Sequence, residues 1–243
     1  VEAIHRTSLR ILGELGIELM SARARALLRA YGAETDESTG NVRLDEELVS
    51  RALASAPPSF TLTPRNPARS VTLGGNHLVF GLVAGPPYVH DFVRGRRAGN
   101  HVDYCDFIRL AQFFNSVHVI GNQVCAPVEL PAGTRHLDCY LANLLLSDRV
   151  YHCTAIGAGR ARDGVAMMAI ARGIPLESMA TDPGVLTIIS VNSPRRFDEA
   201  MADGLVAMAE LGQPVVITPF TLMGAMAPVT LAAALAQQNA EAL

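Results

Sequence analysis

The sequence carries few side chains that could do covalent chemistry, and their types exclude several familiar mechanisms. All 20 cationic side chains are arginine, so the chain offers no lysine for a Schiff base, a pyridoxal anchor or a P-loop. Glycines follow apolar runs in GLVAGPP and IGAGRARDG, but neither run contains GxGxxG or GxxxxGK[ST]. Lysine-dependent aldolase chemistry and dinucleotide binding are therefore disfavoured.

The cysteine and histidine pattern does not favour a metal site. Cys105, Cys125, Cys139 and Cys153 lie in apolar surroundings without a CxxC pair, which is typical of reduced core thiols. His152 and Cys153, together with Cys125, are the combination closest to a zinc site. Adjacent residues on a strand point to opposite faces, however, so His152 and Cys153 are poorly placed to share one ion. We predict no bound metal and no disulfide.

Composition narrows the class of partner. The 243 residues are 49% hydrophobic and 18% charged, which is enough to bury the core of one α/β barrel domain. A net charge of -3 and 5% aromatic residues disfavour a nucleic-acid binder, so a small molecule or a protein is the expected partner. No uninterrupted apolar run reaches membrane-spanning length, and VEAIHRTSLR is typical of an amphipathic helix. We expect a cytoplasmic protein without membrane association.

The first part of the chain has helical periodicity. Ile4, Ile11, Leu12 and Leu15 recur at helical spacing, and a second short helix should end at Gly32. Asp45 can cap a third helix, and a turn-rich segment with two short β-like runs follows it. Residues 1–75 are predicted to form an N-terminal helical head and linker.

From His77 onward, β-branched runs alternate with longer helical ones, which is typical of βα units around a parallel sheet. A small hairpin at the rim is expected near residues 86–99. Ser193 with Pro194 resembles a helix N-cap, and Gly212 before Pro214 resembles a helix stop. The predicted strands cover residues 77–84, 117–124, 150–156, 184–191 and 214–220. The predicted helices start near Asn100, after Thr134, after Arg160, after Pro194 and from about Pro228.

Residues 76–243 are therefore predicted to be a partial TIM-type (β/α) barrel of about five βα units, with the five strands as consecutive parallel neighbours and the helices outside. A complete barrel has eight strands. The final LAAALAQQNAEAL is still in helical register and has no stop signal, so we expect these residues to belong to a larger protein. The alternative is a five-stranded open sheet that is complete in itself.

Three stretches resemble the trimethylamine methyltransferase family. They are IHRTSLRILGELGIEL, YVHDFVRGRRAGNHVDYCDFIRLAQFF and LGQPVVITPFTLMGAMAPVTLAAALAQQNAEAL, and the last is the most specific. VNSPRRFDEAM also stands in its expected place. The resemblance covers essentially the whole chain in order.

The resemblance implies a barrel that moves a methyl group from a methylated amine, with a quaternary one favoured, to the cobalt of a corrinoid protein. Trimethylamine and glycine betaine are example substrates. No cofactor would be bound directly, because the corrinoid (cobalamin) is carried by the partner. Some members use pyrrolysine, at a position beyond Leu243, so no catalytic residue is assigned here. This stretch alone is expected to be inactive, and whether it forms a homo-oligomer stays open.

A quaternary ammonium offers no hydrogen-bond donor, so aromatic faces and oxygen atoms bind it best. In a barrel, these groups come from the carboxyl ends of the strands and the loops after them. Each candidate has a structural alternative: Asn192 can simply precede a helix cap, Thr218 can bond backbone, and Phe220 can be core. The substrate-binding candidates are Asn122, Gln123, His152, Asn192, Thr218 and Phe220, with Tyr88 and Asp91 from the rim hairpin. We expect Asn122, His152, Asn192 and Phe220 to converge on one concavity.

Two other functions stay open at this point. The chain could be a non-catalytic module that binds a betaine-like ligand, or an inactive remnant of a truncated gene. An intact downstream sequence would favour the enzyme, whereas a translated chain that truly ended at Leu243 would leave an open sheet edge and favour the remnant.

Overall fold

The centre of the fold is a four-stranded parallel sheet in the order β12-β10-β9-β8. In this computed structural model, which describes residues 1–121 and 123–243, the strands are β8 (Val119–Ile120), β9 (Val150–His152), β10 (Val185–Val191) and β12 (Val215–Pro219). Sheet neighbours come from successive βα units, as the alternating pattern predicts. The predicted α/β fold and the parallel order are confirmed for these four strands.

The remaining predicted strand, residues 77–84, is not a regular strand. It forms one isolated parallel bridge, from Gly81 to Val119. Val119 donates its backbone N–H to the carbonyl of Phe80, and Leu82 donates to the carbonyl of Val119, at 3.1 and 3.2 Å. The segment thus lies beside β8 in the predicted order. Because β8 itself has only two residues, the hydrogen-bonded ladder is too short to define a fifth strand.

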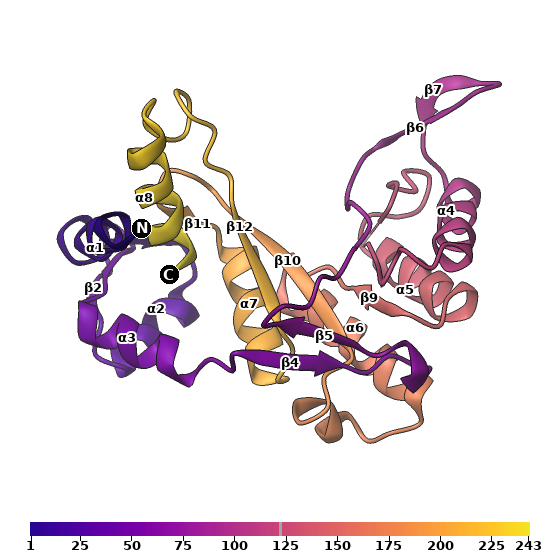
Figure 1. Cartoon of the computed structure of the whole chain (residues 1–243), viewed down its shortest axis with the longest axis horizontal. Coiled ribbons are helices and arrows are strands. Elements are labelled where there is room, and N and C mark those ends of the chain that lie inside the picture. Colours follow the sequence, from indigo (N-terminus) through magenta and orange to yellow (C-terminus); the bar gives the residue numbers. More distant parts are fainter. Residues whose placement is uncertain (122) are drawn as a thin grey trace.

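One face of the sheet is covered by helices (Figure 1). Alternate strand residues such as Tyr151, Cys153 and Ile189 are buried against them. Tyr140, on the helix at residues 135–146, stacks on Tyr151, with ring centroids 5.5 Å apart. These helices are α4 (His101–Phe113), α5 (Arg135–Leu146), α6 (Ala158–Arg172) and α7 (Glu199–Glu210). The burial shows that these helices pack together on one face of the strands.

The opposite face of the sheet is called the inner face here. The described residues cover it only at the amino ends of the strands. An antiparallel hairpin, β4 (Ser59–Leu62) with β5 (Val71–Gly74), packs there against Val150 and Leu186. Further along the strands, Ile188 and Thr218 on this face are exposed. The inner face therefore opens at the carboxyl ends, where a parallel α/β sheet usually binds its ligand.

The capping residues explain where the helices start. Asn100 and Asp103 form a reciprocal capping box at α4. The prediction that Ser193 and Pro194 begin α7 is wrong, because Asp198 caps this helix through the N–H of Met201. The chain first makes a turn and a short strand, β11 (Arg196–Phe197), before the helix can start. Gly212, with φ of 66°, ends the helix as predicted.

The first part of the chain contains more strand than its helical pattern predicts. Between its helices lie three short strands that pair with β11 in the order β11-β1-β3-β2. The helices are α1 (Glu2–Arg10), a π-helical turn (Ile11–Leu15), α2 (Ala22–Ala30), α3 (Glu46–Ser55) and a 3₁₀ turn (Pro67–Arg69). The strands are β1 (Ile17–Leu19), β2 (Glu34–Asp36) and β3 (Asn41–Arg43). The head is therefore a mixed α/β unit.

Later elements bind this head to the sheet. Helix α8 (Leu231–Ala242) packs on α1, and Ser8 donates a hydrogen bond to the carbonyl of Ala236 at 2.8 Å. Strand β11 pairs with β1 in parallel. The predicted domain boundary between residues 75 and 76 stays a prediction. Another 3₁₀ turn (Leu176–Ala180) precedes β10. No helix in the described ranges is long and apolar enough to cross a membrane.

The predicted rim hairpin is present as β6 (Tyr88–Asp91) and β7 (Gly95–Ala98). Asp91 accepts the backbone N–H groups of Val93 and Arg94, and Gly95 has φ of 67°, which together close the turn. In Figure 1 the hairpin projects away from the sheet. Its apolar tip residue Phe92 is fully exposed.

The close approach of α7 to the end of β9 gives a test of this packing. A Cβ atom added at Gly204 would overlap the carbonyl group of Ala155, so we expect Gly204→Ala to lower the free energy of unfolding by about 1–3 kcal/mol. Gly159→Ala, where the added atom meets nothing within 4 Å, is the matched control and should be neutral or slightly stabilising. Urea unfolding followed by circular dichroism measures both. Equal stability of the two variants would contradict the packing.

Candidate functional site

A cavity of about 750 Å³ lies at the carboxyl ends of β9 and β10 on the inner face of the sheet. Its polar lining comes from Gln123, Arg135, His152, Thr154, Arg160 and Ser190. Its apolar lining includes Leu82, Val83, Ile156, Ile188 and Met201. The volume is in the range of small-molecule sites, and the position follows the rule for parallel sheets.

Two residues, one in β9 and one just after it, bring buried polar atoms to this cavity. His152, 4% exposed, accepts the N–H of Ile188 at Nε2 over 2.9 Å, while its Nδ1 has no partner in the described chain. Burial lowers the pKa of His152 from 6.5 to about 4, so the ring is neutral near pH 7 and carries its proton on Nδ1. Thr154, 3% exposed, has an unpartnered Oγ1 in the same part of the structure. Buried polar atoms are normally satisfied, so both are candidates for ligand contact.

Two arginines supply the charge of the cavity. Arg135 is the first residue of α5, and Arg160 lies in the first turn of α6. Arg135 donates to the carbonyls of Val128 and Leu130, and Arg160 to that of Ala132, so one loop holds both guanidinium groups. Neither forms an ion pair with a described carboxylate, and no aspartate or glutamate lines the cavity. The site is therefore electropositive.

Gln123 reaches the cavity from the loop after β8. Its backbone is left-handed, with φ of 46°, and its carbonyl accepts the N–H of Gly85 at 2.9 Å. This bond joins the loop to the segment that bridges β8, and both line the cavity. The neighbouring candidate, Asn122, lies outside the described residues.

Two further candidates lie beside the cavity. Asn192 and Phe220 line a smaller pocket of about 270 Å³ that shares Ser190 with the first. The side chain of Asn192 also accepts the N–H of Asp198 at 3.2 Å, and Asn192 does not directly precede the helix cap, because that cap is Asp198 and not Ser193. Phe220 is 58% exposed, so it is not a core residue in the described chain. The structure thus brings His152 and Gln123 together in one cavity and Asn192 and Phe220 together in the next.

The other three candidates have local partners. Thr218 donates from Oγ1 to the carbonyl of Ile189 at 3.1 Å, the backbone bond considered as its alternative. Tyr88 and Asp91 lie on the projecting hairpin, where Arg96 stands 3.9 Å from the Tyr88 ring and Asp91 pairs with Arg94. None of these three lines either cavity.

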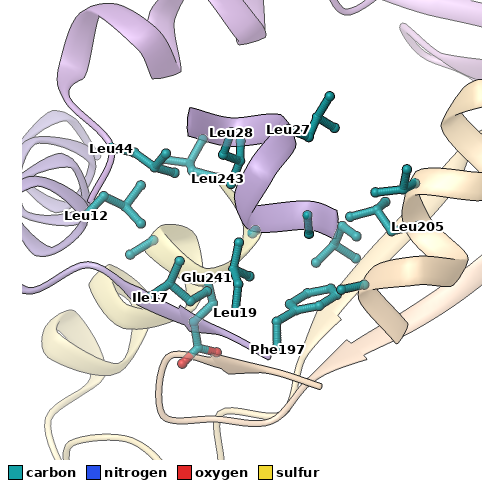
Figure 2. A pocket seen from close by; sticks show the side chains of 16 residues that line it. Leu12, Ile17, Leu19, Leu27, Leu28, Leu44, Phe197, Leu205, Glu241 and Leu243 are labelled. Atoms are coloured by element: carbon teal, nitrogen blue, oxygen red, sulfur yellow. The ribbon is translucent and has the colours of Figure 1, made fainter. Parts of the chain in front are cut away.

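A separate apolar cavity of about 350 Å³ lies between the head and α8 (Figure 2). Leucine is the most frequent residue in its wall, with Leu12, Leu19 and Leu28 among the leucines that line it. In Figure 2 the carboxylate of Glu241 points away from them. That carboxylate accepts hydrogen bonds from Ser193, the N–H of Arg195 and Gln237, so its role is structural. This cavity has no polar group placed for chemistry.

The cysteines occupy core positions. Cys153 lies on the helix-covered face, next to Met208, while His152 faces the cavity. The two side chains thus point to opposite sides of β9, as the strand geometry predicts. Burial raises the pKa of Cys139 and Cys153 to about 12, so both are protonated thiols. The four cysteines are free, and no group of three potential metal ligands occurs among the described residues.

Fold and site define a class: an α/β protein with a polar cavity at the carboxyl edge of a parallel sheet. The family model described as trimethylamine methyltransferase matches residues 1–243, and the chain belongs to this family. The glycine betaine methyltransferase of Desulfitobacterium hafniense (strain Y51) is 34% identical over 243 residues, covering 100% of this chain and 50% of that protein.

More distant relatives have other substrates in their names. The trimethylamine methyltransferase MttB of Desulfitobacterium hafniense (strain DSM 10664 / DCB-2) is 24% identical, covering 99% of this chain and 48% of that protein. The proline betaine:corrinoid methyltransferase of Eubacterium limosum is also 24% identical, covering 100% of this chain and 51% of that protein. The chain spans about half the length of these curated relatives.

Sequence reasoning missed Arg135, Thr154 and Arg160. A signal was present for the arginines, because each lies where a helix of a βα unit begins, near the carboxyl edge of the sheet. Thr154 is two residues beyond His152 and so faces the same side of the strand. The criterion of cation binding selected aromatic, neutral polar and acidic side chains and passed over cationic ones.

Burial of His152 predicts a pH dependence of stability. An unfolded histidine binds its proton near pH 6.5, whereas the folded pKa is about 4, so stability is full above pH 6.5 and falls between pH 6.5 and 4. We expect this residue to account for a loss of about 3 kcal/mol across that window. Urea unfolding at several pH values should show a shallower dependence in His152→Gln and an unchanged one in His90→Gln, an exposed hairpin control. Parallel profiles for wild type and His152→Gln would contradict the burial.

Proposed function

We propose that this chain is part of a methyltransferase that moves a methyl group from a methylated amine to the cobalt of a corrinoid protein. The observation that carries the proposal is the family match over the whole chain. The names of the relatives give methylated amines as substrates, and one of them names a corrinoid. The cavity at the carboxyl edge of the sheet is the place where such an amine would bind.

The proposed architecture is a partial (β/α) barrel. Four parallel strands and a bridging segment follow one another in sequence order, with helices on one face only. The inner face is closed at one end by the β4–β5 hairpin and exposes Ile188 and Thr218 at the other. Side chains of further strands in a closed barrel would meet these residues.

The chemistry proposed for the chain itself is binding and orientation. A quaternary nitrogen leaves as a neutral amine, so it needs no acid to assist departure, and a corrinoid on the partner would supply the nucleophile. This chain must bind the amine, keep water from it and hold one methyl group toward the open edge. Ile156 and Ile188, 52% and 41% exposed at the cavity, form an apolar rim that fits an acceptor delivered from outside.

Measuring turnover distinguishes the proposed enzyme from the two other functions that the sequence leaves open. A binding module would hold the amine without transferring its methyl group, and an inactive remnant would do neither. We also propose the cytoplasm as the compartment, because four free cysteines are compatible with a reducing environment.

Methyl transfer by the complete gene product tests the proposal. With its natural corrinoid partner in the reduced state, at least one of glycine betaine, carnitine, choline and trimethylamine should methylate the cobalt, which the corrinoid absorbance spectrum reports. Reactions without amine and without enzyme are the controls. Tight amine binding without any methylation of the natural partner would favour the binding module instead.

Phe220 gives a second test, since an aromatic face next to a methylated cation adds affinity. We expect Phe220→Ala to weaken binding of a quaternary amine to the complete protein by about 0.5–2 kcal/mol, measured by calorimetric titration. Phe113→Ala is the control, because Phe113 is an exposed aromatic residue on α4 that lines neither cavity. Unchanged affinity in Phe220→Ala would remove this residue from the site.

A further inference from the structure

We propose that Arg135 and Arg160 form a carboxylate-binding subsite, so that the substrate of this cavity is a betaine-type zwitterion carrying both a carboxylate and a methylated nitrogen. The inference rests on the proposed function and narrows its substrate class. It assigns the anion to one part of the cavity and the methylated nitrogen to another.

The charges of the cavity lead to this inference. Among the described residues that line it, two carry guanidinium groups and none carries a carboxylate, and the histidine that lines it is neutral near pH 7. A simple cation such as trimethylammonium would gain no charge partner from these described residues and would be repelled by both arginines. A zwitterion can place its carboxylate against the arginines and its cationic nitrogen further away.

The arginines are held in position with donors to spare. Arg135 uses Nε and Nη2 for the carbonyls of Val128 and Leu130, and Arg160 uses Nη2 for that of Ala132. The remaining guanidinium N–H groups have no partner among the described residues. Because the loop at residues 128–132 already orients both groups, little side-chain freedom remains to be lost when a carboxylate binds.

Buried donors provide independent support for a ligand. His152 and Thr154 are more than nine-tenths buried, line the same cavity and have polar atoms without a partner. Nδ1 of His152 must be a donor, because Nε2 accepts the N–H of Ile188. Helix α6 begins at Ala158 without a side-chain cap, so its first N–H groups add positive potential near Arg160. All three features favour an anionic acceptor.

The apolar lining is suited to the other end of the molecule. Leu82, Val83 and Met201 line the cavity together with the arginines. Methyl groups on a quaternary nitrogen need contact with apolar surface and no hydrogen bonds. The same cavity therefore offers separate surroundings for the two ends of a betaine.

Calorimetric titration of the complete gene product tests the subsite, with glycine betaine and choline as probes. The two share a trimethylammonium group, but only the first has a carboxylate. We expect glycine betaine to bind at least about tenfold more tightly than choline. Arg135→Gln and Arg160→Gln should each weaken glycine betaine binding by about tenfold or more, and choline, which both arginines repel, should bind as well as before or more tightly. Arg162→Gln is the control, since Arg162 lies on the same helix and pairs with Glu210 outside the cavity.

Several outcomes would overturn the inference. These are choline binding as tightly as glycine betaine, an equal loss of both ligands in the arginine variants, or competition with glycine betaine by inorganic phosphate but not by acetate. If a variant fails to fold, the wild-type comparison of the probes still decides. Betaine-selective binding without methyl transfer would reject the proposed function and keep the subsite. Methyl transfer from carboxylate-free amines alone would support the proposed function and reject the subsite.

Discussion

The buried hydroxyl group of Tyr140 determines the geometry of the cavity. It accepts the N–H of Thr154 at 2.7 Å and donates toward the carbonyl of Arg160 at 3.2 Å. One side chain of α5 therefore positions the end of β9 and the start of α6, the two places that bring Thr154 and Arg160 to the cavity. Burial raises the pKa of Tyr140 far above its usual value, so the hydroxyl stays protonated and able to donate. The ring stacks on Tyr151 in the core, which keeps the hydroxyl in place.

The two faces of the sheet have different tasks. The helix-covered face is occupied by apolar and aromatic side chains and by neutral thiols, and it provides stability. The inner face carries the polar residues, and the β4–β5 hairpin blocks only its amino end. Strand alternation separates the two sets along β9, where His152 and Thr154 face the cavity and Tyr151 and Cys153 face the core. Ligand contact and packing therefore use different side chains of the same stretch of chain.

The head is attached through elements that are distant in sequence. Strand β11 leaves the central region to pair with β1, and Glu241 near the end of α8 binds Ser193 and the backbone of Arg195 in the turn before β11. This turn also contains Asn192, which borders the smaller pocket with Phe220. The rigidity of that edge of the site thus depends on α8 and on the head, although neither lines the larger cavity.

The sequence by itself determined the family, through stretches that resemble it along the whole chain. It also determined the α/β class, the order of the parallel strands and most helix limits, because hydrophobic periodicity, caps such as Asn100 and stops such as Gly212 are local signals. It also placed His152 and Gln123 at strand ends. Local signals could not decide that β11 would pair with the head before α7 starts, which moved the cap from Ser193 to Asp198. Nor could they show that Arg135 and Arg160 donate to carbonyls of one loop and line the same cavity as His152 and Thr154, each of which has one buried polar atom without a partner among the described residues. The charge of the cavity depends on residues from separate βα units, and only tertiary packing brings these together.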